Sequence, residues 1–149
     1  MKISKIEEQS IRLVVTLAKG PGQMTLPMLA EAEHLSEALV AKIMGQLRNG
    51  GIITAARGRT GGYELAHSPD NLTVAAVITA LGRPILDGCA STSGGVDDAI
   101  CPHIENCSLR PIWEHLQAEI TETLERITIS ALLNREPKMK KHLAGLRAS

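Results

Sequence analysis

The sequence predicts a mainly α-helical protein that contains one small β-hairpin and ends in a long helix. Apolar residues recur at helical spacing over most of the chain, and one Gly-rich, basic turn separates two strand-like segments. With 149 residues, the chain is long enough for one domain with a core and an appendage. Hydrophobic residues make up 44% but Phe is absent, so the core must consist of aliphatic side chains and Met.

The N-terminal third predicts three helices. The first covers residues 3–18, where apolar residues repeat every three or four positions, and it ends at a Gly-Pro-Gly turn. Thr25 is expected to cap a short second helix with Pro27 in its first turn. Ser36 is expected to cap a third helix, which continues to Arg48 and a pair of glycines. A short helix, a tight connection and a longer capped helix predict a helix-turn-helix.

The segment that follows, IITAARGRTGGYEL, predicts two strands joined by a turn that contains Arg57, Gly58 and Arg59. A helix-turn-helix followed directly by a basic hairpin is typical of a winged helix. Thr73 is then expected to cap another helix, which ends at Gly82 and Pro84. We therefore assign residues 1–84 to a winged-helix DNA-binding domain and residues 85–107 to a cysteine-containing loop.

The last large element is predicted to start at Ser108. Its apolar residues form one continuous stripe, and about 20 residues give roughly 30 Å of helix. One winged-helix domain can cover only part of that stripe, so we expect the remainder to pack against the same helix of a second chain, in a homodimer. Residues 108–133 are thus assigned to a dimerisation helix and a following short helix, and residues 134–149 to a basic, weakly structured tail.

The charge distribution favours a nucleic-acid partner although the net charge is +0. In a winged helix the start of the third helix enters the major groove, and a guanidinium on a thin hairpin fits the minor groove. The candidate DNA-binding residues are Ser36, Glu37, Ala38, Leu39, Lys42, Arg57, Gly58 and Arg59. We expect a cytoplasmic protein without a membrane span or signal peptide. We also expect no enzymatic activity, because no nucleophile with a paired base and no phosphate-binding loop is evident.

Three cysteines, Cys89, Cys101 and Cys107, lie close together in the sequence. They could be buried, idle thiols, since cysteine often serves as a small apolar residue. The polar surroundings of Cys101 and Cys107, and the position of Cys107 just before a helix, favour ligation instead, because a helix N-terminus stabilises a thiolate. Three thiolates suit an iron–sulfur cluster that takes one more ligand, or a structural zinc site that His103 completes.

The order of the helix-turn-helix, the wing RGRTGGY, the helix LTVAAVITAL and the cysteine-helix junction CPHIENCSLRPIWEHLQ resembles the Rrf family of winged-helix transcription regulators, with its IscR-like, NsrR-like and RirA-like members. The resemblance extends from Met1 to about Leu133. It implies a homodimer that pairs through the long helix, binds a palindromic operator and holds an iron–sulfur cluster through three cysteines, here Cys89, Cys101 and Cys107.

The resemblance also bears on the fourth ligand. In IscR-like members a His three positions after the last Cys completes the cluster, whereas Arg110 occupies that position here. In NsrR-like members the partner subunit supplies an acid near the start of its first helix, and Glu8 matches that position. We take Glu8 as the expected ligand, with Glu7, His103 and Glu105 as weaker candidates. The interval between the first two cysteines is longer than in many members.

We therefore expect a transcription regulator, a repressor, whose operator affinity is switched by a [2Fe–2S] or [4Fe–4S] cluster that senses iron, nitric oxide or redox state. The alternatives are a zinc-stabilised or thiol-redox DNA-binding protein, and a small iron–sulfur redox protein that binds no DNA.

Overall fold

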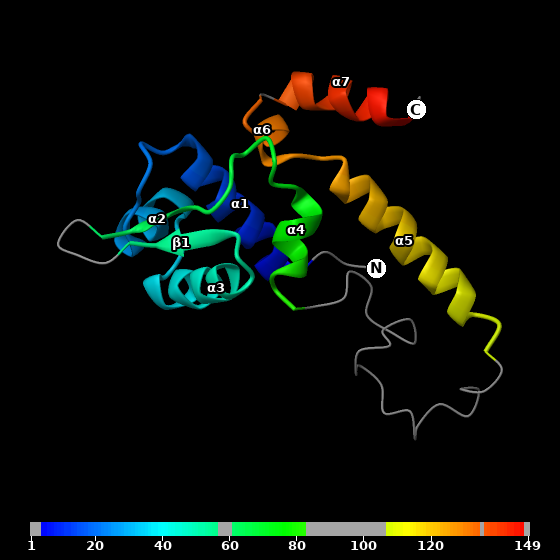
Figure 1. Ribbon diagram of the computed structural model, residues 1–149, viewed down its shortest axis with the longest axis horizontal. Coiled ribbons are helices and arrows are strands. Elements are labelled where there is room, and N and C mark those ends of the chain that lie inside the picture. Colours follow the sequence, from blue (N-terminus) through cyan, green and yellow to red (C-terminus); the bar gives the residue numbers. More distant parts are fainter. Residues whose placement is uncertain (1–3, 57–60, 83–106, 135, 148–149) are drawn as a thin grey trace.

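The computed structural model describes residues 4–56, 61–82, 107–134 and 136–147. Within them the element order is α1 (Lys5–Lys19), α2 (Leu26–Glu33), α3 (Glu37–Asn49), β1 (Ile53–Ala55), β2 (Tyr63–Leu65), α4 (Val74–Thr79), α5 (Arg110–Glu125), α6 (Ile129–Leu132) and α7 (Glu136–Arg147). These residues are mainly helical with one antiparallel hairpin (Figure 1). The predicted fold class is therefore confirmed.

The predicted helix caps are present. Thr25, Ser36 and Thr73 each accept a hydrogen bond from a backbone N–H in the first turn of the helix that follows. The first helix begins with a capping box, in which the Ser4 hydroxyl accepts from the Glu7 N–H and the Glu7 carboxylate accepts from the Ser4 N–H. Each such bond satisfies a backbone donor that the helix itself leaves unpaired.

Helices α2 and α3 form the helix-turn-helix. α2 ends at His34, which adopts a left-handed conformation with φ 53°. The N–H of the next residue, Leu35, returns 2.9 Å to the carbonyl of Ala30. This turn redirects the chain so that Ser36 can open α3 at once.

The hairpin pairs Ile53 with Leu65 and Ala55 with Tyr63. A third segment extends it on the other side, because Met24 and Tyr63 exchange backbone hydrogen bonds of 3.0 and 2.8 Å. Gly62 permits this approach, since a Cβ at that position would lie 2.8 Å from the Met24 carbonyl oxygen. The sequence did not predict the added strand-like segment, which fixes the base of the hairpin to the start of α2.

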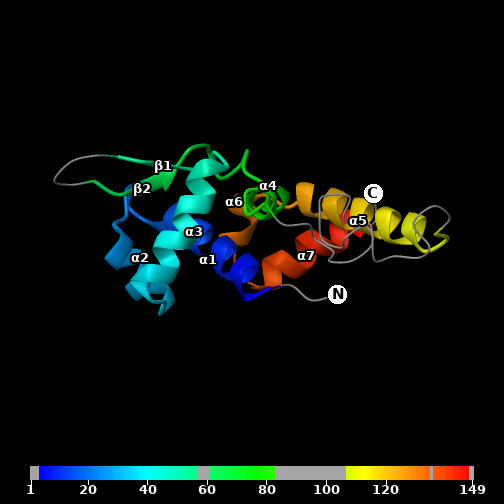
Figure 2. The ribbon, with the colours of Figure 1, turned by 90° about the horizontal axis from the view of Figure 1, so that it is seen from below.

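One aliphatic core joins helices α1, α2, α3, α4 and α6 and strand β1. Its fully buried large side chains include Leu13, Leu29, Ile43, Met44, Leu47, Ile53 and Ile129. The hairpin lies at one end of the long axis and the start of α5 at the other (Figures 1 and 2). The core therefore holds the helix-turn-helix and the hairpin as one unit, from which α5 projects.

Helix α5 has no buried residue. Its C-terminal end is tied to the start of α4 by a short antiparallel bridge, in which the Val74 N–H bonds to the Ile127 carbonyl at 2.9 Å and the Ile129 N–H bonds to the Leu72 carbonyl at 2.7 Å. Thr128 then caps α6, which buries Ile129 completely. One end of α5 is thus anchored on the domain, while its first half remains exposed.

The C-terminal segment differs from the weakly structured tail that the sequence predicted, because it contains helix α7. Met139, Leu143 and Leu146 recur at helical spacing, and Met139 and Leu146 pack against the core. A Glu136–Lys140 ion pair of 2.7 Å one turn apart supports the same helix. The density of lysines concealed this apolar stripe in the sequence.

Candidate DNA-binding and cluster-binding sites

The exposed start of α3 carries several of the predicted DNA-binding residues. Ser36, Ala38 and Lys42 are exposed, whereas Leu39 is half-buried and packs against the core. The Ser36 oxygen accepts the Leu39 N–H at 3.3 Å, which leaves its own hydroxyl proton available to a phosphate. The start of α3 therefore exposes one small polar group, a methyl group and a cation.

The predicted wing residues Arg57, Gly58 and Arg59 lie outside the described residues. The chain on both sides of them is defined, since the Ala56 N–H bonds to the Gly62 carbonyl at 2.9 Å and continues the β1–β2 ladder. The described residues on either side of this segment therefore form the base of a hairpin that is attached to the helix-turn-helix.

Of the predicted cluster ligands in the cysteine loop, only Cys107 belongs to the described residues. Its thiol is free and half-buried. Cys89, Cys101, His103 and Glu105 lie outside them. Among the residues that are described, no group of three or more His, Cys, Asp or Glu side chains is placed to hold a metal ion.

Cys107 lies two residues before Leu109, the N-cap of α5. The sequence indicated Ser108 as the cap, but the structure differs, and Leu109 supplies no side-chain hydrogen bond to the first turn. α1, α2, α3, α4 and α6 each have a capping side chain. Because the N-terminal end of a helix dipole is positive, the start of α5 favours a negatively charged group beside Cys107.

Glu8 lies exposed in the first turn of α1, directly after Glu7 of the capping box. Its Oε1 accepts hydrogen bonds from Arg12, at 2.7 Å from Nη2 and 3.1 Å from Nε. Glu7, the weaker candidate, is buried and caps α1 through the Ser4 N–H at 2.7 Å. Of these two acids, Glu8 is therefore the one that does not cap the helix, and its contact with Arg12 was not predicted from the sequence.

Helix α5 is connected to α3 through α4, a contact that was not predicted from the sequence. The start of α4 is hydrogen bonded to residues 127–129, directly after α5, and the end of α4 touches Gly50 at the end of α3. A Cβ built on Gly50 would lie 2.4 Å from the Cβ of Ala80. The sequence signal was the glycine pair at positions 50 and 51, which we interpreted only as a helix stop.

The fold and the exposed face of α3 define a winged-helix DNA-binding protein. The family model described as Rrf2, iron-dependent transcriptional regulator, matches residues 3–135. The chain therefore belongs to the Rrf2 family of transcription regulators, and it is not an enzyme. The resemblance and the DNA-binding function predicted from the sequence are confirmed. None of the helices among the described residues is long and apolar enough to cross a membrane.

Two curated relatives illustrate the range of the family. The chain is 30% identical over 134 residues to the HTH-type transcriptional regulator CymR of Bacillus subtilis, covering 89% of both chains. It is 29% identical over 125 residues to the HTH-type transcriptional regulator IscR of Erwinia tasmaniensis, covering 83% of this chain and 72% of that one.

Two solved structures agree with these relatives. IscR of T. potens superposes with a TM-score of 0.66 at 27% identity, covering 89% of this chain and 86% of that chain. CymR, described as the global cysteine regulator of B. subtilis, superposes with a TM-score of 0.64 at 27% identity, covering 89% of this chain and 96% of that chain. The chain is thus similar both to IscR and to CymR.

Proposed function

We propose that this protein is a homodimeric repressor in the cytoplasm whose affinity for a palindromic operator is switched by an iron–sulfur cluster. The observation that carries the proposal is the start of α5, where Cys107 is a free, half-buried thiol two residues before an N-cap, Leu109, that supplies no side-chain hydrogen bond to the helix. The positive end of the helix dipole stabilises a thiolate or an anionic cluster there, whereas it would not stabilise a cysteine that serves only as an apolar residue.

The proposed ligands are Cys89, Cys101 and Cys107 of one subunit and Glu8 of the other. Cys107 and Glu8 fit this role, because Cys107 is not in a disulfide and the Glu8 carboxylate is exposed. The bound cluster would supply a redox-sensitive and nitric-oxide-sensitive group. As a ligand, Glu8 would exchange its Arg12 ion pair for the metal. Such a surface pair stabilises a protein by well under about 1 kcal/mol, so the exchange is energetically easy.

The homodimer is supported by the apolar face of α5. Leu109, Ile112, Trp113 and Leu116 are 56, 52, 43 and 40% exposed. They lie within two helical turns and form one contiguous apolar surface, of the kind that marks an interface rather than a scatter of surface residues. Pairing of α5 with the same helix of a second chain would cover it and would bring two helix-turn-helix units to two half-sites.

The contacts of α4 offer a route from the cluster to the DNA. A shift of α5 on loss of the cluster would act on α4 through the bridge between residues 127–129 and 72–74. It would then act on the end of α3 through the contact of Ala80 with Gly50. Because a dimer spans two half-sites in only one arrangement, a small movement of α3 suffices to change operator affinity strongly.

The test is anaerobic purification followed by iron and sulfide assays, a visible spectrum and operator binding, for the wild type and for Cys107→Ser. We expect a brown wild-type protein whose DNA affinity changes on exposure to nitric oxide or an iron chelator, and a folded, colourless Cys107→Ser dimer that has lost this response. A protein that binds one zinc ion per chain would contradict the cluster, and so would a Cys107→Ser variant that responds normally.

The second candidate is a thiol-redox regulator without a cluster. The similarity to CymR, the global cysteine regulator, favours it, as does the free thiol of Cys107. In that case the purified protein would hold no metal, and its DNA affinity would change on oxidation by a mild disulfide and return on reduction. The same purification therefore separates the two candidates.

A further inference from the structure

We propose that helix α7 is part of the dimer interface, and that the groove between α5 and α7 receives the first half of the partner's α5. This inference rests on the proposed homodimer and specifies a surface for it. The occupant is a second copy of this chain.

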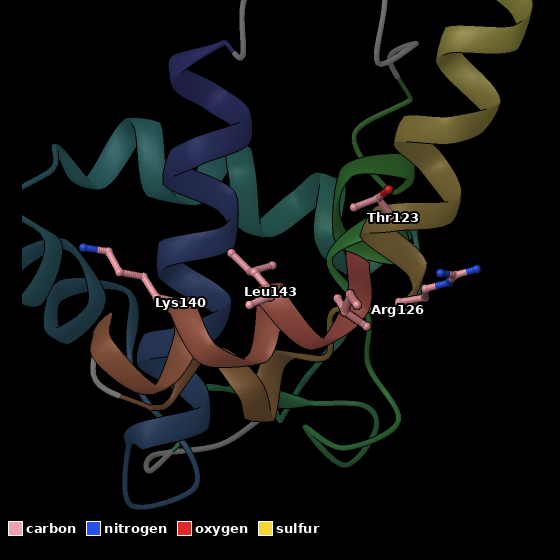
Figure 3. Close-up of a pocket in the computed structure, with 6 residues that line it drawn as sticks. Thr123, Arg126, Lys140 and Leu143 are labelled. Carbon is pink, nitrogen blue, oxygen red and sulfur yellow. The ribbon is translucent and has the colours of Figure 1, made fainter. Parts of the chain in front are cut away.

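The groove is lined by two residues near the end of α5 and four residues of α7, namely Thr123, Arg126, Lys140, Leu143, Ala144 and Leu146. Its volume is about 640 Å³. Figure 3 shows Thr123 and Leu143 beside the hollow, with Lys140 towards one end and Arg126 towards the other. Apolar side chains thus form much of its wall, with a cation near each end.

Leu143 is the large apolar residue of α7 that the domain does not bury. Met139 and Leu146 of the same helix pack against the core, whereas Leu143 remains 38% exposed on the groove side. A helix that used its apolar face only to dock on its own domain would not need a third large apolar residue there. The exposed Leu143 therefore indicates a further contact.

The groove continues the exposed apolar face of α5. Leu109, Ile112 and Leu116 are three and four residues apart, and Thr123 follows Leu116 by seven residues, which is almost two full turns. Thr123 therefore lies on the same side of α5 as the exposed apolar residues, one half-helix further on. A partner that packs along this face at the end of α5 must also contact the groove.

The anchoring of α5 favours an antiparallel pair. Its last residues are hydrogen bonded to the domain through Val74 and Ile129, and its first half projects from the domain (Figure 1). In an antiparallel, two-fold pair each projecting half reaches the anchored half of the other helix. If Leu116 lies opposite Ile120 of the partner, then Thr123 lies opposite the partner's Trp113, a large apolar side chain that suits the groove.

The two helices also carry opposite charge. α5 contains Glu114, Glu119, Glu122 and Glu125 against Arg110, whereas α7 contains Lys138, Lys140, Lys141 and Arg147 against Glu136. Within the part of the chain that the structure describes, Lys140 and Arg126 at the groove form exposed ion pairs with Glu136 and Glu122, each one turn earlier in the chain. Such pairs are weak, so both cations could turn towards acids of the partner's α5.

The first measurement is site-specific photo-cross-linking from benzoylphenylalanine at position 143, with the same group at Lys141 as control. Lys141 is exposed on α7 but does not line the groove. Mixed ¹⁴N and ¹⁵N chains distinguish cross-links between subunits from those within one. We expect position 143 to yield products between subunits that map to residues 109–116, and position 141 to yield few. Position 143 products confined to one chain would overturn the inference.

The second measurement is the dimer dissociation constant from sedimentation, for the wild type, Leu143→Glu, Leu143→Ala and Lys141→Glu. We expect Leu143→Glu to raise the constant by about tenfold or more and Leu143→Ala to raise it less, with Lys141→Glu near wild type. Circular dichroism checks that α7 remains folded. A stable wild-type dimer that Leu143→Glu leaves unchanged would overturn the role of α7 alone, whereas a monomeric wild type would overturn the homodimer as well.

Discussion

Gly50 and Ala80 are in such close contact that a side chain at position 50 has no space. A Cβ on Gly50 would lie 2.4 Å from the Cβ of Ala80 and 2.9 Å from its Cα. Gly50 is the C-cap of α3 and Ala80 is the C-cap of α4. The end of the DNA-reading helix thus packs closely against the end of the helix that contacts α5, so a displacement of α4 would act directly on α3.

This contact predicts that Gly50→Ala destabilises the protein. Gly50 has φ −80°, which alanine adopts freely, so the reduced entropy of the unfolded chain alone would stabilise the variant by about 0.4–1 kcal/mol. Overpacking against Ala80 costs about 1–3 kcal/mol and outweighs that gain. Denaturant unfolding at fixed protein concentration measures the difference.

Gly45→Ala is the matched control, because Gly45 lies within α3 with nothing within 4 Å of an added Cβ. Removing a mid-helix glycine should stabilise that variant by about 0.5–1 kcal/mol. If Gly50→Ala were as stable as Gly45→Ala, α4 would yield without cost, and the proposed coupling between α5 and α3 would lose its physical basis.

Substitutions at the neighbouring residues Glu7 and Glu8 should have opposite effects: one should lower stability, and the other should change the cluster spectrum. Glu7→Ala leaves the Ser4 N–H without its 2.7 Å partner and should cost about 1 kcal/mol of stability, with an unchanged cluster spectrum. Glu8→Ala removes only an exposed pair with Arg12, worth about 0.3–0.5 kcal/mol, but should change the visible spectrum and circular dichroism of the cluster. Identical spectra for Glu8→Ala and the wild type would remove Glu8 from the ligand set.

The wing predicts a change in the salt dependence of DNA binding. If Arg57 and Arg59 each contact a phosphate in the minor groove, replacing both with Ala should lower affinity and reduce the slope of log K against log salt by about 1.8. Lys138→Ala with Lys141→Ala, on α7, removes the same charge and should leave the slope nearly unchanged. An equal effect of both pairs would mean that net charge, and not the wing, governs binding.

The winged helix could be predicted from the sequence because each of its elements has a local signal. Thr25, Ser36 and Thr73 are capping residues next to periodic apolar runs, and the hairpin has β-branched residues on one side of a glycine-rich turn. Those signals depend on neighbours in the chain. The contacts of Met24 with Tyr63 and of Gly50 with Ala80 depend on how distant elements pack, and no local pattern encodes them.

In the candidate site, too, local features could be predicted and contacts between distant elements could not. The spacing of Cys107 from α5 and the capping role of Glu7 are local, and the i,i+4 spacing of Glu8 and Arg12 could have revealed their ion pair from the sequence alone. The groove of α5 and α7 could not be predicted, because the lysines of α7 outweigh its three large apolar residues and indicate a solvated tail. Packing of Met139 and Leu146 on the core decided the structure of that segment.

Substitutions at two isoleucines should separate the stability of the fold from the stability of the dimer. Ile129 is completely buried in α6 beneath the end of α5, so Ile129→Ala should lower the free energy of unfolding by about 2–5 kcal/mol. Ile112 is 52% exposed on α5, so within one chain its truncation removes little buried surface.

Ile112→Ala should therefore act on the dimer, raising its dissociation constant by about tenfold because each subunit contributes the same side chain to a two-fold interface. Sedimentation gives the dissociation constant, and urea unfolding at matched protein concentration gives the stability. The expected pattern is a large loss of stability with unchanged dimerisation for Ile129→Ala, and the reverse for Ile112→Ala. If Ile112→Ala left the dissociation constant unchanged, the exposed face of α5 would not be the surface through which the two chains pair.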